Sequence, residues 1–266
     1  MSRQLRFATF LAPSIRPVYQ TVADYVGREL GCDTALVEGR SFGEFAAGAC
    51  DIGFICGLPY VELMAQDPPP VELLAAPVLQ GERYGGRPIY FSDVIVRRDS
   101  PFHTFADLRG RSWSYNDPDS HSGYGVTRYH MVRLGETAGF FGSVIEVGYH
   151  QESIRLVRAG EVDASAIDSQ VLAVAMRDNP MLAEELRVID TLGPSSIQPV
   201  VAARTLPDSL KADIQAALLR MHTDPQAALG LSHGLVERFV PVTDAGYDDI
   251  REMLALTEAA GFSVLR

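Results

Sequence analysis

Cysteine is scarce in this sequence, and the patterns that mark several common protein classes are missing. The three cysteines are an odd number without a Cys-x-x-Cys pair, which fits neither a disulfide framework nor a structural zinc site. No window approaches the roughly 18 consecutive apolar residues of a membrane-spanning helix. There is neither a His-Glu-x-x-His zinc motif nor a Walker phosphate loop. We therefore expect no metal, no cofactor, no catalytic residue and no direct insertion into a membrane.

The remaining composition is that of a globular protein with an acidic balance. Its 266 residues, 47% hydrophobic and 21% charged, are enough for one large α/β domain or for two lobes. The excess of acidic residues gives a formal charge of −11, which opposes binding to nucleic acid or to anionic lipid. An anionic ligand would therefore have to be held by local hydrogen-bond donors and dipoles.

Strand and helix signals alternate along the chain in two blocks. In the first block, strands are expected at residues 5–10, 34–38 and 52–55, and helices at 18–30, 42–49 and 60–65. Extended segments follow at 71–79 and 88–96. In the second block, strands are expected at 112–115, 142–147, 162–168 and 187–191, and helices at 105–108, from 121, and at 150–159. A last extended run at 199–203 precedes a mainly helical remainder from residue 207.

This alternation predicts an α/β protein with two lobes. Two extended segments, 94–98 and 199–204, join the blocks, so the chain would cross between the lobes twice, as in a two-segment hinge. We expect residues 1–96 plus 204–266 to form lobe 1 and residues 97–203 to form lobe 2, each a mixed sheet flanked by helices. Ligand sites in such sheets lie at the carboxyl ends of strands, so the loops after the strands are the candidate sites.

The most informative loop precedes the helix expected from residue 121. It reads Asn-Asp-Pro-Asp-Ser-His-Ser-Gly over residues 116–123. Ser120 is placed to cap the helix, and Gly123 lets backbone amides approach a ligand closely. A helix start has unpaired N–H groups and partial positive charge, so hydroxyls and amides there can hold an oxyanion without a cationic side chain. The alternative is that Asp119, Ser120 and Ser122 only cap the helix.

Four further residues stand at comparable positions. His150 begins a helix after a strand, where it can donate a hydrogen bond to an anion or serve only as a cap or surface residue. Asp168 follows a short strand and can cap the next helix, accept a proton from a monoprotonated oxyanion, or pair with an ammonium group. Tyr60 and Tyr90 can donate a phenol hydrogen to a ligand or pack within the cores.

Together these residues lie in runs that resemble the phosphonate and phosphite binding components of ABC importers, the PhnD-like family. The runs are residues 105–111 leading to 116–123, then 148–153, then 159–169, and the similarity extends over roughly residues 5–205. The resemblance implies a two-lobed type II periplasmic-binding fold that clamps a small tetrahedral oxyanion, namely a phosphonate, phosphite or phosphate. It also implies the membrane subunits of an ABC importer as partners.

The resemblance assigns roles to single residues. It implies that Ser120, His121 and Ser122 bind the oxyanion at the helix start together with Gly123, with His150 opposite. The family pattern usually reads Ser-Thr-Ser-Gly, and here His121 replaces the threonine. A neutral His121 donates one hydrogen bond, and a protonated one would strengthen anion binding as the pH falls. Further contacts from the cleft walls are implied for Tyr60, Tyr90 and Asp168.

Binding components of this kind are exported, and the sequence after Met1 does not read as a secretion signal. We expect a periplasmic location if a leader has been removed, and a cytoplasmic one if Met1 is the native start. In the second case the scaffold would serve as a ligand sensor, or as an enzyme with His121, His150 and Asp168 as acid and base. Binding without catalysis is the preferred interpretation.

Overall fold

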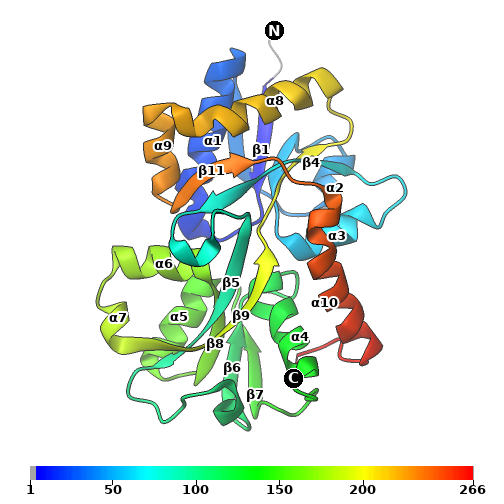
Figure 1. Cartoon of the computed structure of the whole chain (residues 1–266). Helices are drawn as coiled ribbons and strands as arrows, with labels where there is room; N and C mark the ends of the chain where they lie inside the picture. Colours follow the sequence, from blue (N-terminus) through cyan, green and yellow to red (C-terminus); the bar gives the residue numbers. More distant parts are fainter. Residues whose placement is uncertain (1–3, 266) are drawn as a thin grey trace. The chain divides into compact units, whose positions relative to one another are not determined.

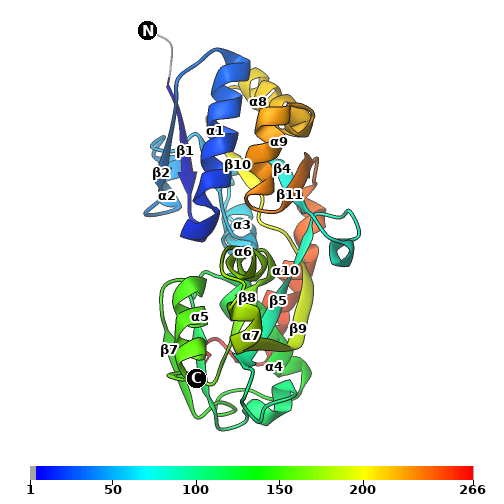
Figure 2. The same ribbon diagram turned by 90° about the vertical axis from the view of Figure 1, so that its left-hand side faces the viewer.

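The computed structural model describes residues 4–265, which divide into two compact units (Figures 1 and 2). Unit 1 holds the described residues up to Ile89 together with Ser196–Asp248. Unit 2 holds Tyr90–Ser195 and the described residues from Asp249 onward. Each unit has its own mixed sheet flanked by helices, which confirms the predicted fold class.

Unit 1 is built on a six-stranded sheet with the order β11-β4-β10-β3-β1-β2. Strand β1 pairs in parallel with β2 and β3, whereas β10 runs antiparallel to β3 and β4, and β11 runs antiparallel to β4. Every residue of β3 is buried, as expected for an apolar run in the interior of a sheet that is covered on both faces. The strands are β1 (Leu5–Thr9), β2 (Thr34–Glu38), β3 (Ile52–Phe54), β4 (Val71–Leu79), β10 (Val200–Ala203) and β11 (Val236–Val240).

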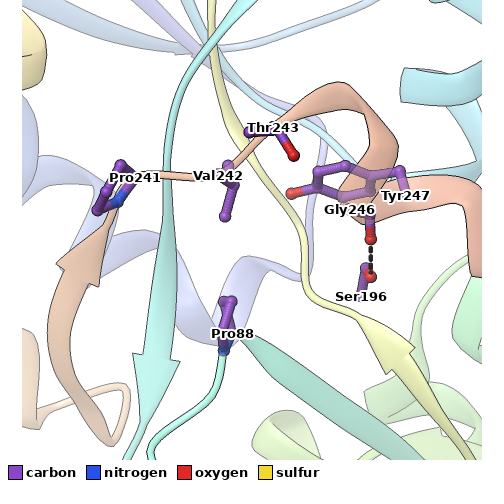
Figure 3. A pocket seen from close by; sticks show the side chains of 7 residues that line it. All are labelled: Pro88, Ser196, Pro241, Val242, Thr243, Gly246 and Tyr247. Carbon is purple, nitrogen blue, oxygen red and sulfur yellow. Dashed lines mark hydrogen bonds between the residues drawn. The ribbon is translucent and has the colours of Figure 1, made fainter.

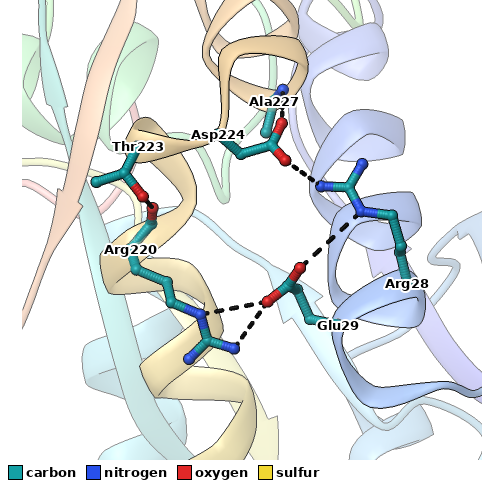
Figure 4. A network of polar contacts seen from close by, with 6 residues as sticks. All are labelled: Arg28, Glu29, Arg220, Thr223, Asp224 and Ala227. Carbon is teal, nitrogen blue, oxygen red and sulfur yellow. Dashed lines mark hydrogen bonds and ion pairs between the residues drawn. The ribbon is translucent and has the colours of Figure 1, made fainter.

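Helix α1 of unit 1 packs against both α8 and α9, and an ion-pair network joins the three helices (Figures 2 and 4). Arg28 on α1 lies 2.6 Å from the Asp224 carboxylate, which caps α9, and Arg220 at the end of α8 lies 2.9 Å from Glu29. These side chains are partly exposed, so each pair contributes little to stability. The helices of unit 1 are α1 (Arg16–Leu30), α2 (Gly43–Ala46), α3 (Gly57–Met64), α8 (Asp208–Arg220) and α9 (Pro225–Ser232), with short helical turns η1 (Pro13–Ile15), η2 (Glu82–Tyr84), η5 (Met221–Thr223) and η6 (Asp244–Tyr247).

Unit 2 is built on a five-stranded sheet with the order β7-β6-β8-β5-β9. Strand β6 is parallel to both β7 and β8, and β5 is antiparallel to β8. The strands are β5 (Ile89–Arg97), β6 (Ser112–Tyr115), β7 (Ser143–Glu146), β8 (Ala164–Asp168) and β9 (Leu186–Ser196). The helices are α4 (Val126–Arg133), α5 (His150–Ala159), α6 (Ser169–Asp178), α7 (Leu182–Glu185) and α10 (Asp248–Ala259), with the turns η3 (Phe105–Leu108) and η4 (His121–Gly125).

An aromatic cluster forms much of the core of unit 2 and fixes the position of β6. The ring of Trp113 on β6 is fully buried and stacks on Phe141, with 4.7 Å between the ring centroids. Phe105 stacks on Phe140 at 5.5 Å and meets Trp113 edge to face. Since β6 leads into the candidate loop at residue 116, this packing anchors the strand from which that loop starts.

The predicted lobe boundaries differ from those of the two units. Residues 94–98 are not a hinge, because β5 pairs with β8 from Ser92 to Val96 inside the sheet of unit 2. Residues 199–204 are not one either, because β10 pairs with β3 and β4 inside unit 1. The chain changes unit after Ile89 and after Ser195 instead.

The C-terminal segment also departs from the prediction. It was expected in lobe 1, but the described residues from Asp249 belong to unit 2, since Phe262 and Leu265 are buried in the core of that unit. The chain therefore passes between the units three times rather than twice. The stretch after residue 207 is mainly helical, as predicted, and also contains β11, which pairs with β4 at the edge of the first sheet.

Candidate ligand-binding site

The loop between β6 and α4 ends in a helix start that Ser120 caps. Ser120 Oγ accepts a hydrogen bond from the Gly123 amide at 3.2 Å, and the Ser120 carbonyl accepts from the amides of Tyr124 and Gly125. The first turn, η4, is π-helical and continues directly into α4. The predicted N-cap is thus confirmed, and the Ser-His-Ser-Gly run occupies the start of the helix.

Side chains from two helix starts meet at this turn. Ser122 Oγ lies 3.2 Å from Ser120 Oγ and 2.8 Å from His150 Nε2. His150 is the first residue of α5, which follows β7, while η4 follows β6. Because β6 and β7 are neighbouring parallel strands, both helix starts lie at the same edge of the sheet. The structure therefore brings together three residues that the sequence suggested as ligand contacts.

This hydrogen-bonded group is buried and only partly satisfied. Ser120, Ser122 and His150 are each between 3% and 7% exposed. Within residues 4–265, neither His150 Nδ1 nor Asn116 Oδ1 has a hydrogen-bond partner, although both atoms are buried. Buried polar atoms without partners are uncommon in folded proteins, so these two atoms mark the group as a candidate binding site.

Two glycines in the turn leave no room for a side chain. A Cβ at Gly123 would stand 2.0 Å from Asn116 Oδ1, and a Cβ at Gly125 would stand 2.9 Å from His121 Nδ1. Real Cβ atoms are not found so close to other heavy atoms, so a larger residue would displace Asn116 or His121. The glycines therefore determine where these two polar side chains lie.

Both histidines of the site are neutral near pH 7. Burial lowers the pKa of His121 to about 4 and the pKa of His150 to about 4, because a charged imidazole loses its hydration inside the protein. The expectation that protonated His121 strengthens anion binding therefore does not hold at ordinary pH. Each ring acts as a neutral group with one donor and one acceptor. A base with a pKa this far below 7 is also poorly matched to acid–base catalysis at neutral pH.

His121 has a partner that the sequence did not suggest. Its Nε2 lies 3.0 Å from Ser195 Oγ, near the end of β9, and both side chains are buried. Nothing in the sequence marks Ser195, which is separated from His121 by 74 positions and lies in no recognisable motif. Only the pairing of β9 at the edge of the second sheet brings the two residues together.

Asp168 and Tyr90 lie in the same unit as the turn. Asp168 ends β8 and caps α6, its Oδ1 accepting hydrogen bonds from Gln170 N at 2.8 Å and Val171 N at 3.3 Å. Turn η4 packs against β8. Tyr90 is buried on β5, two residues before Ser92, the residue that pairs with Asp168. Asp168 thus acts as the N-cap of α6, which is one of the roles expected for it.

Tyr60 is the one predicted site residue that belongs to unit 1. It is fully buried in the first turn of α3, and its hydroxyl donates to Asp244 Oδ1 at 2.7 Å. Its ring packs on Tyr247 with 4.6 Å between the centroids. Tyr60 therefore packs within the core of unit 1, which is one of the two alternatives expected for it.

One Gly-x-Ser-x-Gly pattern, residues 39–43, resembles the nucleophile elbow of hydrolases in sequence only. Ser41 Oγ accepts a hydrogen bond from the Gly43 amide at 3.2 Å. No histidine among the described residues is bonded to it, so this serine has no base to activate it.

The sequence model of one protein family, described as the phosphonate periplasmic substrate-binding protein of ABC transporters, matches residues 8–247. The chain belongs to this family. Phosphonate-binding proteins of this kind are the solute-binding components of transporters, not enzymes, and the family is periplasmic. Among the described residues, no helix combines the length and the apolar character that crossing a bilayer requires.

Solved structures show the same fold at low sequence identity. A binding protein component of an ABC phosphonate transporter from Pseudomonas aeruginosa is 16% identical, with a TM-score of 0.85 over 98% of this chain and 88% of that one. PhnD1 from Prochlorococcus marinus in complex with methylphosphonate is 16% identical, with a TM-score of 0.79 over 94% and 96% of the two chains. The chloride-bound protein XAC2383 from Xanthomonas citri is 18% identical, with a TM-score of 0.75 over 98% and 99%. These likenesses confirm the two-lobed type II periplasmic-binding fold.

Proposed function

We propose that this phosphonate-binding family member captures a small tetrahedral oxyanion, a phosphonate, phosphite or phosphate, at the start of η4. The observation that carries the proposal is the buried group formed by Ser120, Ser122 and His150 at two converging helix starts. None of these side chains is cationic. Methylphosphonate, the ligand in the Prochlorococcus marinus structure, has the tetrahedral shape and negative charge that such a group would accept.

The chemistry of the group suits an anion in an acidic protein. Hydroxyls, a neutral imidazole and the amides of a helix start donate hydrogen bonds without bringing a compensating charge, and the helix dipole favours the anion. Within the protein the same polar atoms bond to one another at 2.8 and 3.2 Å. Oxyanion oxygens would replace these neutral contacts by charge-assisted hydrogen bonds, which are shorter and roughly twice as strong.

The experiment is a thermal-shift screen with methylphosphonate, 2-aminoethylphosphonate, phosphite, phosphate and sulfate. A ligand present at one hundred times its Kd raises the free energy of unfolding by about 2.7 kcal/mol. We expect at least one of these anions to stabilise the parent protein and to be recovered unchanged.

The same screen on the double variant Ser120→Ala with Ser122→Ala tests the site. Each hydrogen bond to a charged group is worth about 1.5–3 kcal/mol, so losing two weakens binding at least a hundredfold and removes the shift. A matched control, Ser100→Ala with Thr104→Ala, also removes two hydroxyls from unit 2, in the segment that leads into β6. If the double variant responds like this control, the assigned site is wrong.

The family membership also supports the biological setting that we propose. As the substrate-binding component of an ABC importer, the protein would work in the periplasm and deliver its ligand to the membrane subunits of the transporter. Cell fractionation and co-purification with those subunits test this part separately from ligand binding.

A further inference from the structure

Ser195 and His121 form the contact that links the ligand turn to β9. The distance between His121 Nε2 and Ser195 Oγ is 3.0 Å, and the two residues are 1% and 3% exposed. A buried hydroxyl facing a buried imidazole makes a hydrogen bond that water does not replace, so the two side chains hold each other in place.

Ser195 is the last residue of its segment in unit 2, and Ser196 is the first residue of the next segment in unit 1. Ser196 Oγ donates to the Gly246 carbonyl at 2.5 Å, beside a pocket of about 260 Å³ that Pro88 and Tyr247 also line (Figure 3). Two adjacent hydroxyls on one strand therefore bond within different units. The hydroxyl of Ser195 contacts the candidate ligand turn through His121.

The ring of His121 is held from two sides. A Cβ at Gly125 would stand 2.9 Å from Nδ1, so this edge of the ring lies close over the Gly125 backbone. The opposite nitrogen, Nε2, meets Ser195. A serine hydroxyl both donates and accepts, so it pairs with Nε2 in either tautomer of the neutral ring, and the contact restrains the ring whichever nitrogen carries the proton.

We infer that Ser195 is a positioning residue of the ligand site, whose hydroxyl fixes the ring orientation of His121 and so ties the η4 turn to the strand by which the chain leaves unit 2. The inference rests on the proposed function for its effect on binding. Its structural part, the fixed ring orientation, concerns the protein by itself.

The binding test uses titration calorimetry with methylphosphonate and with inorganic phosphate. We expect Ser195→Ala to raise the Kd about tenfold, because the ligand must then order a His121 ring that its hydrogen bond no longer holds in place. Ser195→Thr, which keeps the hydroxyl, should restore the Kd to within about threefold of the parent value. Ser196→Ala is the matched control, since it removes the neighbouring hydroxyl, and its Kd should stay within about twofold. An equal loss in Ser195→Ala and Ser196→Ala would overturn the inference, as would parental binding by Ser195→Ala.

The second test reads the surroundings of the His121 ring by nitrogen-15 NMR of the histidine rings, without any ligand. Ser195→Ala should change the ring shifts of His121 while leaving those of His150 in place, because His121 alone loses its hydroxyl partner. Unchanged His121 shifts, or equal changes at His121 and His150, would overturn the inference. If the parent binds neither probe but Ser195→Ala shifts His121 alone, the proposed function fails while the positioning role stands.

Discussion

The two buried histidines make the stability of the protein depend on pH, and the size of the effect follows from their pKa values. An unfolded chain protonates histidine near pH 6.5, whereas the pKa of His150 and that of His121 are each about 4 in the folded protein. Between these values the unfolded state binds more protons, so the free energy of unfolding falls as the pH falls. For each histidine the loss between pH 7 and pH 5 is about 2 kcal/mol.

The assay is urea unfolding of the parent and of His150→Gln at pH 7 and at pH 5. We expect the variant to lose about 2 kcal/mol less than the parent between these pH values, since its residue 150 no longer titrates. Burial also lowers the pKa of His130, but that residue is present in both proteins, so its contribution cancels. The exposed His222, replaced by Gln, controls for the loss of a histidine elsewhere. An identical pH dependence in parent and His150→Gln would refute the reasoning.

Three further predictions follow from the packing around the turn and from the division into two units. Gly123→Ala should lower the free energy of unfolding by about 1–3 kcal/mol and weaken oxyanion binding, because its Cβ would stand 2.0 Å from Asn116 Oδ1. Chemical unfolding measures the first effect and calorimetry the second, and parental values for both would contradict the prediction. Arg128→Met should lower the free energy of unfolding in urea by about 1–3 kcal/mol, because buried Arg128 donates to the Phe262 carbonyl at 2.9 Å and to Thr257 Oγ1 at 3.2 Å. The control Arg133→Met replaces an exposed arginine on the same helix and should lower it much less. Equal losses in the two variants would show that the hydrogen bonds of Arg128 do not contribute to stability. If ligand closes the two units on each other, small-angle scattering will show a smaller radius of gyration with methylphosphonate than without it, and an unchanged radius counts against the clamp.

Most of the fold could be predicted from local sequence patterns. The helix that ends at Gly31, the strand at 112–115 and the helix at 150–159 all lie where periodicity and capping residues place them. The boundaries between units could not be predicted in this way. Extended apolar segments such as β5 and β10 look the same whether they cross between units or pair inside a sheet, and only the strand partners distinguish the two.

The site was predictable to the extent that each contact begins a helix after a strand. Ser120 and His150 carry that signal, because the carboxyl ends of neighbouring parallel strands share one edge of the sheet. Ser195 carries none, since it approaches His121 only through tertiary packing. The neutrality of His121 and His150 could not be predicted either, because a pKa depends on burial, which a sequence gives only indirectly.

The most direct test of the account is a crystal structure of the protein with methylphosphonate. The account predicts a phosphonate whose oxygens lie about 2.6–3.2 Å from Ser120 Oγ, Ser122 Oγ and a ring nitrogen of His150, in place of the contacts that these atoms now make with one another. A phosphonate bound elsewhere, with the bonds between Ser120, Ser122 and His150 intact, would contradict it.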